Sequence, residues 1–171
     1  CEITGDPRKI QRAERIIFPG VGAAGEAMTH LRSAGLNACI RDVFQAGKPI
    51  LGICLGTQVI FEYSEEDNAT CLGLVPGRVK RFPEGLRQDG RPIKIPHMGW
   101  NRVDFTGHHP VFRALPSGSE FYFVHSFYPV PADEKLVAGW SDYGIRFCAV
   151  VAYQNLVAVQ FHAEKSGRFG L

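Results

Sequence analysis

Short apolar runs bounded by turn residues are the main pattern in the first part of this chain. Residues 15–18 and 50–54 form runs of strand length, and Pro19 and Gly20 are expected to end the first of them. Helical periodicity separates and follows these runs. The order strand, helix, strand, helix predicts an α/β fold whose parallel sheet carries helices on both faces.

Three helices are expected between and after these strands. The first begins near Gly25, and the second runs from Asn37 as N-cap to Gly47 as C-cap. A third continues after residue 54 until the acidic segment 64–68 ends it. These helices would cover the parallel strands.

From residue 77 onward the pattern becomes short strand-like runs, so the second half is expected to add an antiparallel or mixed sheet portion to the mostly parallel one. A tight hairpin is expected at residues 153–156. The expected strands are residues 79–82, 93–95, 100–105, 121–124, 136–140, 149–153 and 156–161.

Composition indicates one soluble globular domain. The chain has 171 residues, of which 45% are hydrophobic, and its formal charge of +2 comes from interspersed basic and acidic residues. No cationic stripe indicates nucleic acid as a partner, and no apolar run is long enough to indicate a membrane span or a signal peptide. We therefore expect a cytoplasmic protein.

Cysteine and histidine spacing argues against a structural role for disulfides or zinc. The odd number of five cysteines shows no paired short spacing, which favours a reducing compartment. The six histidines have no metal-ligand spacing apart from the adjacent His108 and His109. No metal or cofactor is expected.

The segment Gly52-Ile53-Cys54-Leu55-Gly56 places one thiol on a tight turn between a strand and a helix. Flanking glycines permit the cramped backbone of a nucleophile elbow, in which the side chain projects from the sheet beside the next backbone N–H. We expect the N–H of Leu55 to serve an oxyanion and the helix dipole to favour a thiolate at Cys54.

The tail of the chain supplies a base and a group to orient it. An apolar strand over residues 158–161 leads to His162 and Glu164, which are two residues apart and share one side while the backbone stays extended. His162 would accept the thiol proton and Glu164 would hold the imidazole. Both would lie at the carboxyl ends of strands, where open α/β sheets place their sites.

A second oxyanion donor is expected from the turn after the first strand, at Val21 and Gly22, opposite Leu55. The nucleophile, the base with its orienting group, and the two oxyanion donors together suffice for acyl transfer from an amide or ester carbonyl. Each residue alone has a simpler interpretation, because a lone cysteine is most often a small buried hydrophobe and a lone histidine is most often structural. Only their combination favours catalysis.

Taken together, these motifs closely resemble the class I glutamine amidotransferases, the triad glutaminases. Within them, the chain is similar to the glutaminase subunits of imidazole glycerol phosphate synthase. The resemblance spans most of the chain and implies a three-layer, flavodoxin-like open sheet. It rests on residues 18–22, 52–58, 96–101, 123–126 and 159–167.

The resemblance implies that Cys54 attacks the side-chain amide of glutamine and that ammonia passes to a (β/α)₈-barrel cyclase subunit in a heterodimer. The cyclase would use it to make imidazole glycerol phosphate in histidine biosynthesis. Substrate-binding roles fall to Gln58, Ser126 and Glu66, and partner-interface roles to Trp100, Tyr122 and Lys165. Without the family, these aromatic residues would be assigned to the core and the lysine to a solvated surface.

Three departures from the family pattern are visible. Ala163 stands where the family has proline between the histidine and the glutamate, which keeps the spacing but loses the rigid φ. The expected first strand and helix, and the expected last helix, have no counterpart in the chain. We therefore expect residues 1–171 to be a single glutamine amidotransferase domain without those elements.

Other functions remain open on the sequence alone. A glutaminase of another synthase is the nearest, although residues 96–101 fit the histidine-pathway subunit better. The second alternative is a cysteine peptidase or related hydrolase with the same elbow, in which Gln58 and Glu164 would have no assigned role. A non-catalytic binding module that retains the fold is the third.

Overall fold

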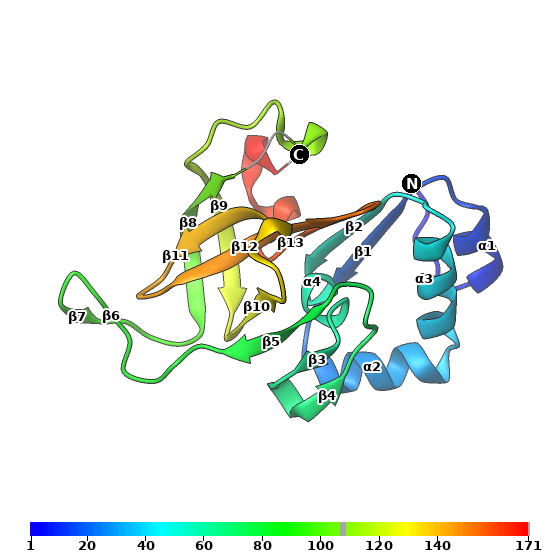
Figure 1. Ribbon diagram of the computed structural model, residues 1–171, viewed down its shortest axis with the longest axis horizontal. Helices are drawn as coiled ribbons and strands as arrows, with labels where there is room; N and C mark the ends of the chain where they lie inside the picture. The colour runs from blue at the N-terminus through cyan, green and yellow to red at the C-terminus, as the bar shows by residue number, and fades with distance from the viewer. Residues whose placement is uncertain (107–108, 171) are drawn as a thin grey trace.

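The computed structural model describes residues 1–106 and 109–170, and a seven-stranded sheet forms its centre (Figure 1). Its parallel part consists of β1 (Ile16–Gly20), β2 (Ile50–Cys54) and β13 (Leu156–Val159), with β2 in the middle. Parallel register places Gly20 opposite Cys54 and Val159 opposite Ile53. The carboxyl ends of the three strands therefore meet at one edge.

Four antiparallel strands extend this sheet, which confirms the α/β class with an antiparallel addition. They are β12 (Arg146–Tyr153), β11 (Val137–Asp142), β8 (His97–Phe105) and β9 (Ser119–His125), in that spatial order after β13. The expected hairpin at residues 153–156 is confirmed, since Tyr153 pairs with Leu156 and Gln154 has φ 53°. The parallel share is smaller than expected.

A second sheet contains three strands that the sequence pattern did not reveal. Its order is β10 (Phe127–Pro131), β5 (Gly77–Arg81), β3 (Tyr63–Ser64) and β4 (Ala69–Thr70). Pro129 and Pro131 hid β10, because proline argues against a strand. Residues 93–95, expected as a strand, belong to no strand and follow the small hairpin of β6 (Arg87–Gln88) and β7 (Arg91–Pro92). The N–H of Ile93 donates to the carbonyl oxygen of Leu86, just before β6, at 3.0 Å.

The first strand is longer than expected. β1 continues through Pro19 and Gly20, which pair with Ile53 and Cys54 of β2. In the described part of the sheet β1 is an edge strand, and proline is tolerated there because its missing N–H can face away from the ladder. The strand therefore delivers residue 21 directly beside the end of β2.

The α-helices are α1 (Pro7–Arg12), α2 (Ala24–Ser33), α3 (Leu36–Gln45) and α4 (Leu55–Val59). The start of α2 agrees with expectation, but α3 is capped by Gly35 at φ 68° and by Ala46, so Asn37 lies inside it and is not its N-cap. The helix after Cys54 is only five residues long, because the chain turns into β3. Short 3₁₀ helices are η1 (Glu66–Asn68), η2 (Pro110–Phe112), η3 (Glu134–Leu136), η4 (Ala163–Lys165) and η5 (Gly167–Phe169).

The two faces of β2 contact different cores. Ile50 packs with the buried side chains of α2, α3 and α4, while Ile53 packs with a cluster rich in phenylalanine that includes Phe121, Phe123 and Phe147. Strands β8, β9, β11 and β12 supply much of this second cluster, whereas the sequence pattern predicts helices on this face. Two packed faces hold the end of β2 rigidly.

Candidate active site

The turn at Cys54 has the strained geometry of a nucleophile elbow. Cys54 has φ 53° and ψ −110°, ends β2 and precedes α4. A Cβ atom on Gly52 would lie 2.8 Å from the Cβ of Ala158, and one on Gly56 would lie 2.0 Å from the carbonyl oxygen of Phe18. Both glycines are therefore required by close packing of the turn against its neighbouring strands.

A cavity of about 250 Å³ opens at this turn. Its lining unites residues from β2, α4, the turn after β1, η1, β9, β10 and the tail. Eight expected site residues lie in it, which brings the nucleophile, base, oxyanion and substrate candidates into one cavity. The lining residues are Val21, Gly22, Cys54, Leu55, Gln58, Glu66, Val124, His125, Ser126, Phe127 and His162.

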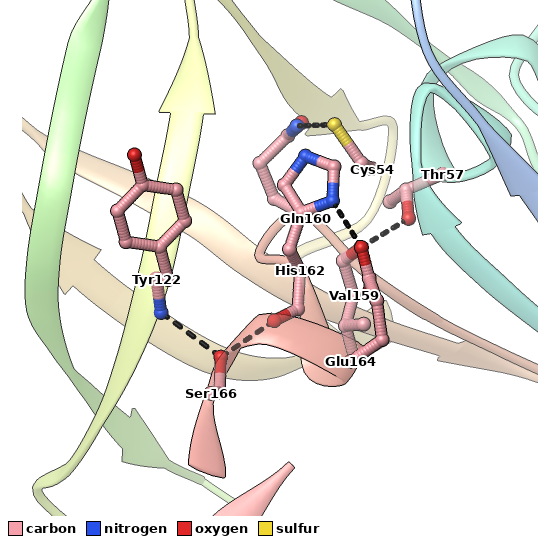
Figure 2. A network of polar contacts seen from close by, with 8 residues as sticks. All are labelled: Cys54, Thr57, Tyr122, Val159, Gln160, His162, Glu164 and Ser166. Atoms are coloured by element: carbon pink, nitrogen blue, oxygen red, sulfur yellow. Dashed lines mark hydrogen bonds and ion pairs between the residues drawn. The ribbon is translucent and has the colours of Figure 1, made fainter.

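His162 and Glu164 meet as expected, but by a different backbone route. β13 ends at Val159, and Ala163 begins the 3₁₀ helix η4, so the backbone between the two residues is not extended. The turn still brings the imidazole Nδ1 to 2.7 Å from Glu164 Oε1 (Figure 2). Glu164 does not line the cavity; it contacts the imidazole on the side away from Cys54.

The backbone of His162 is itself held from both sides. Its N–H donates to the carbonyl oxygen of Tyr122 (2.8 Å), and its own carbonyl accepts from the hydroxyl of Ser166 (2.6 Å). The Ser166 oxygen in turn accepts from the N–H of Tyr122 at 3.0 Å (Figure 2). Hydrogen bonds to Tyr122 on β9 and to Ser166 after η4 thus hold the backbone of His162 in place.

Burial governs the charge of Cys54. It raises the pKa of the thiol to about 11, with the N–H of Leu55 opposing the rise and the charges of Glu164 and Glu66 adding to it. The expectation that the helix dipole would favour a thiolate is wrong for the free protein, since α4 has little over one turn and burial outweighs it. Cys54 rests as a neutral thiol and needs a base.

The oxyanion candidates line the same cavity as the sulfur. Val21 and Gly22 contribute to its wall together with Leu55, and Gly22 has φ 94°, a conformation that favours glycine. Gly20 permits the approach, because a Cβ there would lie 3.0 Å from the Cβ of Leu55. The two segments that would supply N–H donors therefore lie in direct contact.

Glu66 reaches the cavity from η1 and also anchors α2. Its Oε2 accepts a hydrogen bond from the N–H of Ala24 at 2.8 Å, at the start of that helix. Burial raises the pKa of the carboxyl, and the neighbouring charge of Asp67 acts in the same direction. Asp67 accepts from the next N–H, that of Gly25, at 3.2 Å.

Gln58 lines the cavity, but protein groups already occupy its amide nitrogen. Nε2 donates to the carbonyl oxygen of Phe127 (3.0 Å) and to Gln160 Oε1 (3.1 Å). The neighbouring Thr57 hydroxyl donates to the carbonyl oxygen of Val159 at 2.6 Å. Consecutive residues of α4 therefore tie the elbow to β10 and β13.

Sequence reasoning missed two buried polar residues at this site. His125 lines the cavity, and Gln160 lies behind it with its amide 4.0 Å from the Cys54 sulfur. A glutamine within the apolar run before His162 was the one available clue to Gln160. His125 lies in the segment 123–126 that carries the family resemblance, but the sequence indicates only a structural or interface role for it, because its contact with Phe127 depends on β10, which was not expected.

The three interface candidates lie beside the cavity and not in its lining. Trp100 on β8 is 56% exposed, and its ring centroid lies 6.2 Å from that of Tyr122 on β9. Lys165 is exposed on η4, next to Glu164. Met98, which was not among the candidates, extends the exposed apolar surface of β8.

The described part of the chain contains neither a candidate metal cluster nor a candidate membrane-spanning helix. Across residues 1–106 and 109–170, no three or more His, Cys, Asp and Glu side chains form a group able to hold a metal ion. His108 lies outside the described residues. Within the same ranges, no helix has the length and apolar character needed to cross a membrane.

The chain is similar over its whole length to proteins of one known family. A model of the glutamine amidotransferase class-I family matches residues 2–170. The chain is 48% identical to imidazole glycerol phosphate synthase subunit HisH of Nitratidesulfovibrio vulgaris strain DP4, over 100% of the chain and 80% of that protein. It is 52% identical to the subunit of the same name from Methylococcus capsulatus, over 99% of the chain and 79% of that protein.

Solved structures share the fold at low sequence identity. A glutamine amidotransferase from Thermotoga maritima matches 90% of the chain and 57% of its own length with a TM-score of 0.64 and 19% identity. The glutaminase domain of CTPS from Trypanosoma brucei, with bound acivicin, matches 96% of the chain and 71% of its own length with a TM-score of 0.65 and 18% identity. Both likenesses establish the open α/β fold.

Proposed function

The chain belongs to the class I glutamine amidotransferase family and is a glutamine amidotransferase, and we propose that it works as the glutaminase subunit of an imidazole glycerol phosphate synthase in histidine biosynthesis. One observation carries the residue assignment. Cys54 and His162 line the same cavity, although more than a hundred positions separate them, and Glu164 contacts the far nitrogen of the imidazole. The catalytic set is Cys54, His162 and Glu164.

The reaction begins from a neutral thiol. As Sγ of Cys54 attacks the side-chain carbonyl carbon of glutamine, His162 Nε2 accepts the thiol proton, and Glu164 stabilises the imidazolium through Nδ1. The tetrahedral oxyanion lies between the backbone N–H groups of Leu55 and of Val21 or Gly22. Burial makes the base necessary, since little thiolate exists before substrate binds.

Collapse of the tetrahedral intermediate breaks the carbon–nitrogen bond. His162 returns the proton to the departing nitrogen, which leaves as ammonia, and a glutamyl thioester remains on Cys54. Water, deprotonated by the same imidazole, then hydrolyses the thioester to glutamate and restores the thiol. Ser126 and Glu66 contribute polar groups to the cavity for the glutamine, and Gln58 contributes from α4.

The surface beside the cavity fits a partner that receives ammonia. Met98 and Trp100 project from β8 into solvent, and their register partners on β9 are Val124 and Tyr122. Because directly opposed side chains share a face of the sheet and Val124 lines the cavity, the exposed apolar surface reaches the edge of the active site. A (β/α)₈-barrel cyclase docked over Trp100, Tyr122 and Lys165 would take up ammonia before it escapes into water.

We place this activity in the cytoplasm, in a single domain spanning residues 1–171. All five cysteines are free, and four of them are buried, which suits a reducing compartment. We also expect weak glutaminase activity in the free subunit and a large rise once the cyclase and its nucleotide ligand bind. Gly20 and Gly22 make rearrangement of the intervening Val21 inexpensive.

The decisive experiment measures glutamate release from glutamine by the purified protein, alone and with the cyclase subunit and its nucleotide ligand. Cys54→Ala should abolish release under both conditions. Incubation with a glutamine-analogue electrophile, followed by mass mapping, should place the adduct on Cys54. An adduct elsewhere would overturn the assignment, and equal turnover with and without the partner would remove the coupling.

A further inference from the structure

The buried amide of Gln160 faces the proposed nucleophile. Its Nε2 lies 4.0 Å from the Sγ of Cys54, and the residue is 0% exposed (Figure 2). The contact is long for a neutral thiol, which is a weak acceptor. The amide can donate a hydrogen bond to the sulfur only if its nitrogen, and not its oxygen, is held toward Cys54.

Gln58 fixes the orientation of that amide. The carbonyl oxygen of Phe127 can only accept, so the Gln58 atom 3.0 Å from it is the amide nitrogen. The second hydrogen of this nitrogen points to Gln160 at 3.1 Å, so the Gln160 atom on that side is the oxygen. The nitrogen of Gln160 is left facing Cys54.

Two histidines continue the network from the same carbonyl. Phe127 also accepts from Nδ1 of His125 at 2.8 Å, and Nε2 of His125 lies 2.9 Å from Nδ1 of His97. Burial lowers the pKa of His125 to about 3 and that of His97 to about 4, so both rings are neutral near pH 7. His125 therefore accepts at Nε2, and His97 donates from Nδ1.

The outer end of the network is also determined by backbone groups. Asn101 Oδ1 accepts from the N–H of Arg102 (2.8 Å), and Asn101 Nδ2 donates to the carbonyl oxygen of Asp142 (2.9 Å). The other hydrogen of Nδ2 points to Nε2 of His97 at 3.2 Å. Each amide and imidazole of the network, from Asn101 to Gln160, is thus oriented by a neighbour.

From these contacts we propose that Gln160 is a further catalytic residue, whose amide N–H donates to the Cys54 sulfur as it becomes a thiolate. The inference rests on the proposed role of Cys54 as nucleophile. Gln58 acts as a positioning residue, because rotating the Gln160 amide would break the hydrogen bond to Gln58. His125 and His97 support this arrangement indirectly, through the carbonyl of Phe127 that also accepts from Gln58. Active-site hydrogen bonds that are long in the free enzyme commonly shorten as charge develops.

The test measures the rate at which iodoacetamide alkylates Cys54, between pH 7 and pH 10, with mass mapping to separate this cysteine from the other four. Gln160→Met keeps the length of the side chain and removes the donor. We expect the pKa of the Cys54 thiol to rise by about one unit, seen as about 10-fold slower labelling at a fixed pH below it. Gln45→Met, on the exposed end of α3, is the matched control and should label like the parent.

A second measurement does not depend on any variant. The assigned network requires the Nδ1–H tautomer at both His97 and His125, and ¹⁵N chemical shifts of the two imidazoles report it directly. Finding either ring as the Nε2–H tautomer would overturn the orientation of the network. Asn101→Asp, which replaces the outer donor by an acceptor, should shift the His97 tautomer and slow Cys54 labelling less than Gln160→Met does.

The outcomes separate this inference from the proposed function. If Cys54 of the parent protein resists both iodoacetamide and the glutamine analogue, its role as nucleophile fails. If the parent labels at Cys54 and Gln160→Met labels with the same pH profile, only the role of Gln160 fails.

Discussion

The Nδ1 atom of His162 lies 2.7 Å from Oε1 of Glu164, yet the two side chains differ sharply in exposure, at 3% and 54%. The buried imidazole lines the cavity, whereas the carboxylate of Glu164, on η4, is exposed to solvent. Solvent screening weakens the attraction of an exposed carboxylate for a charged partner. Glu164 therefore contributes mainly by orienting the imidazole.

Replacing Glu164 should reduce turnover without abolishing it. Glu164→Ala removes the orienting group and should lower kcat for glutamate release by roughly 10²-fold, the lower end of what acid–base catalysis provides. Glu164→Gln keeps an acceptor for Nδ1–H and should retain more activity than the alanine variant. Glu84→Gln, an exposed control, should behave like the parent. Full activity in Glu164→Ala would exclude it from the catalytic set.

Acid should destabilise the protein through the two buried histidines. Burial lowers the pKa of His97 from 6.5 to about 4 and that of His125 from 6.5 to about 3. As the pH falls below 6.5, each histidine therefore binds a proton in the unfolded chain before it does so in the folded protein. Their stabilising contribution is complete above pH 6.5 and is lost as the pH falls toward 3. Each group can contribute a slope of up to about 1.4 kcal/mol per pH unit. Urea unfolding between pH 7 and pH 4 measures this slope.

His97→Phe isolates one of the two contributions. The phenyl ring can keep the stacking that His97 makes with Tyr143 and Phe123, at centroid distances of 4.0 and 4.9 Å. We expect lower stability at pH 7, by about 1–3 kcal/mol for the unpaired buried Nε2 of His125, together with a shallower acid slope. An unchanged slope would show that His97 binds protons to the same extent in the folded and unfolded states, so that burial does not lower its pKa.

The glycine at position 56 should tolerate no side chain. In Gly56→Ala the new Cβ would lie 2.0 Å from the carbonyl oxygen of Phe18, so β1 or the elbow must move. We expect a loss of at least about 3 kcal/mol in the free energy of unfolding, with loss of activity. Gly5→Ala, where nothing lies within 4 Å, should change stability by less than about 0.5 kcal/mol. Similar stabilities for the two variants would contradict the close packing at the elbow.

Local features of this fold could be predicted from the sequence, and long-range ones could not. The elbow at Cys54 and the hairpin at Gln154 depend on adjacent residues, so their motifs are informative. The strand β10 is different, because its prolines argue against a strand and its stability comes from pairing with β5. Its absence from the prediction also concealed the role of His125, whose hydrogen-bond partner is the carbonyl of Phe127.

The prediction of a thiolate at Cys54 was wrong for a related reason. A helix dipole can be read from sequence, but the burial that raises the pKa of Cys54 depends on β9, β13 and the tail packing around it. The pairing of His162 with Glu164 was right because their spacing permits contact in a 3₁₀ turn as well as in a strand. Spacing alone could not distinguish the two backbones.

The exposed apolar residues on β8 should matter for assembly and little for folding. Met98 and Trp100 are 61% and 56% exposed, so truncating Trp100 to alanine removes little buried surface from the free subunit. We expect its free energy of unfolding to change by less than about 1 kcal/mol. Aromatic anchors near the centre of an interface commonly contribute 2 kcal/mol or more, so the dissociation constant for the cyclase subunit should rise by roughly 30-fold or more.

Titration calorimetry with the cyclase and urea unfolding of the free subunit test the two halves of this prediction. Val111→Ala on η2 is the matched control, because Val111 is similarly exposed but does not belong to the β8–β9 surface. It should leave cyclase binding unchanged. If Trp100→Ala binds the cyclase as tightly as Val111→Ala does, the docking surface lies elsewhere, and ammonia must leave the cavity by a route that does not pass Val124 and Met98.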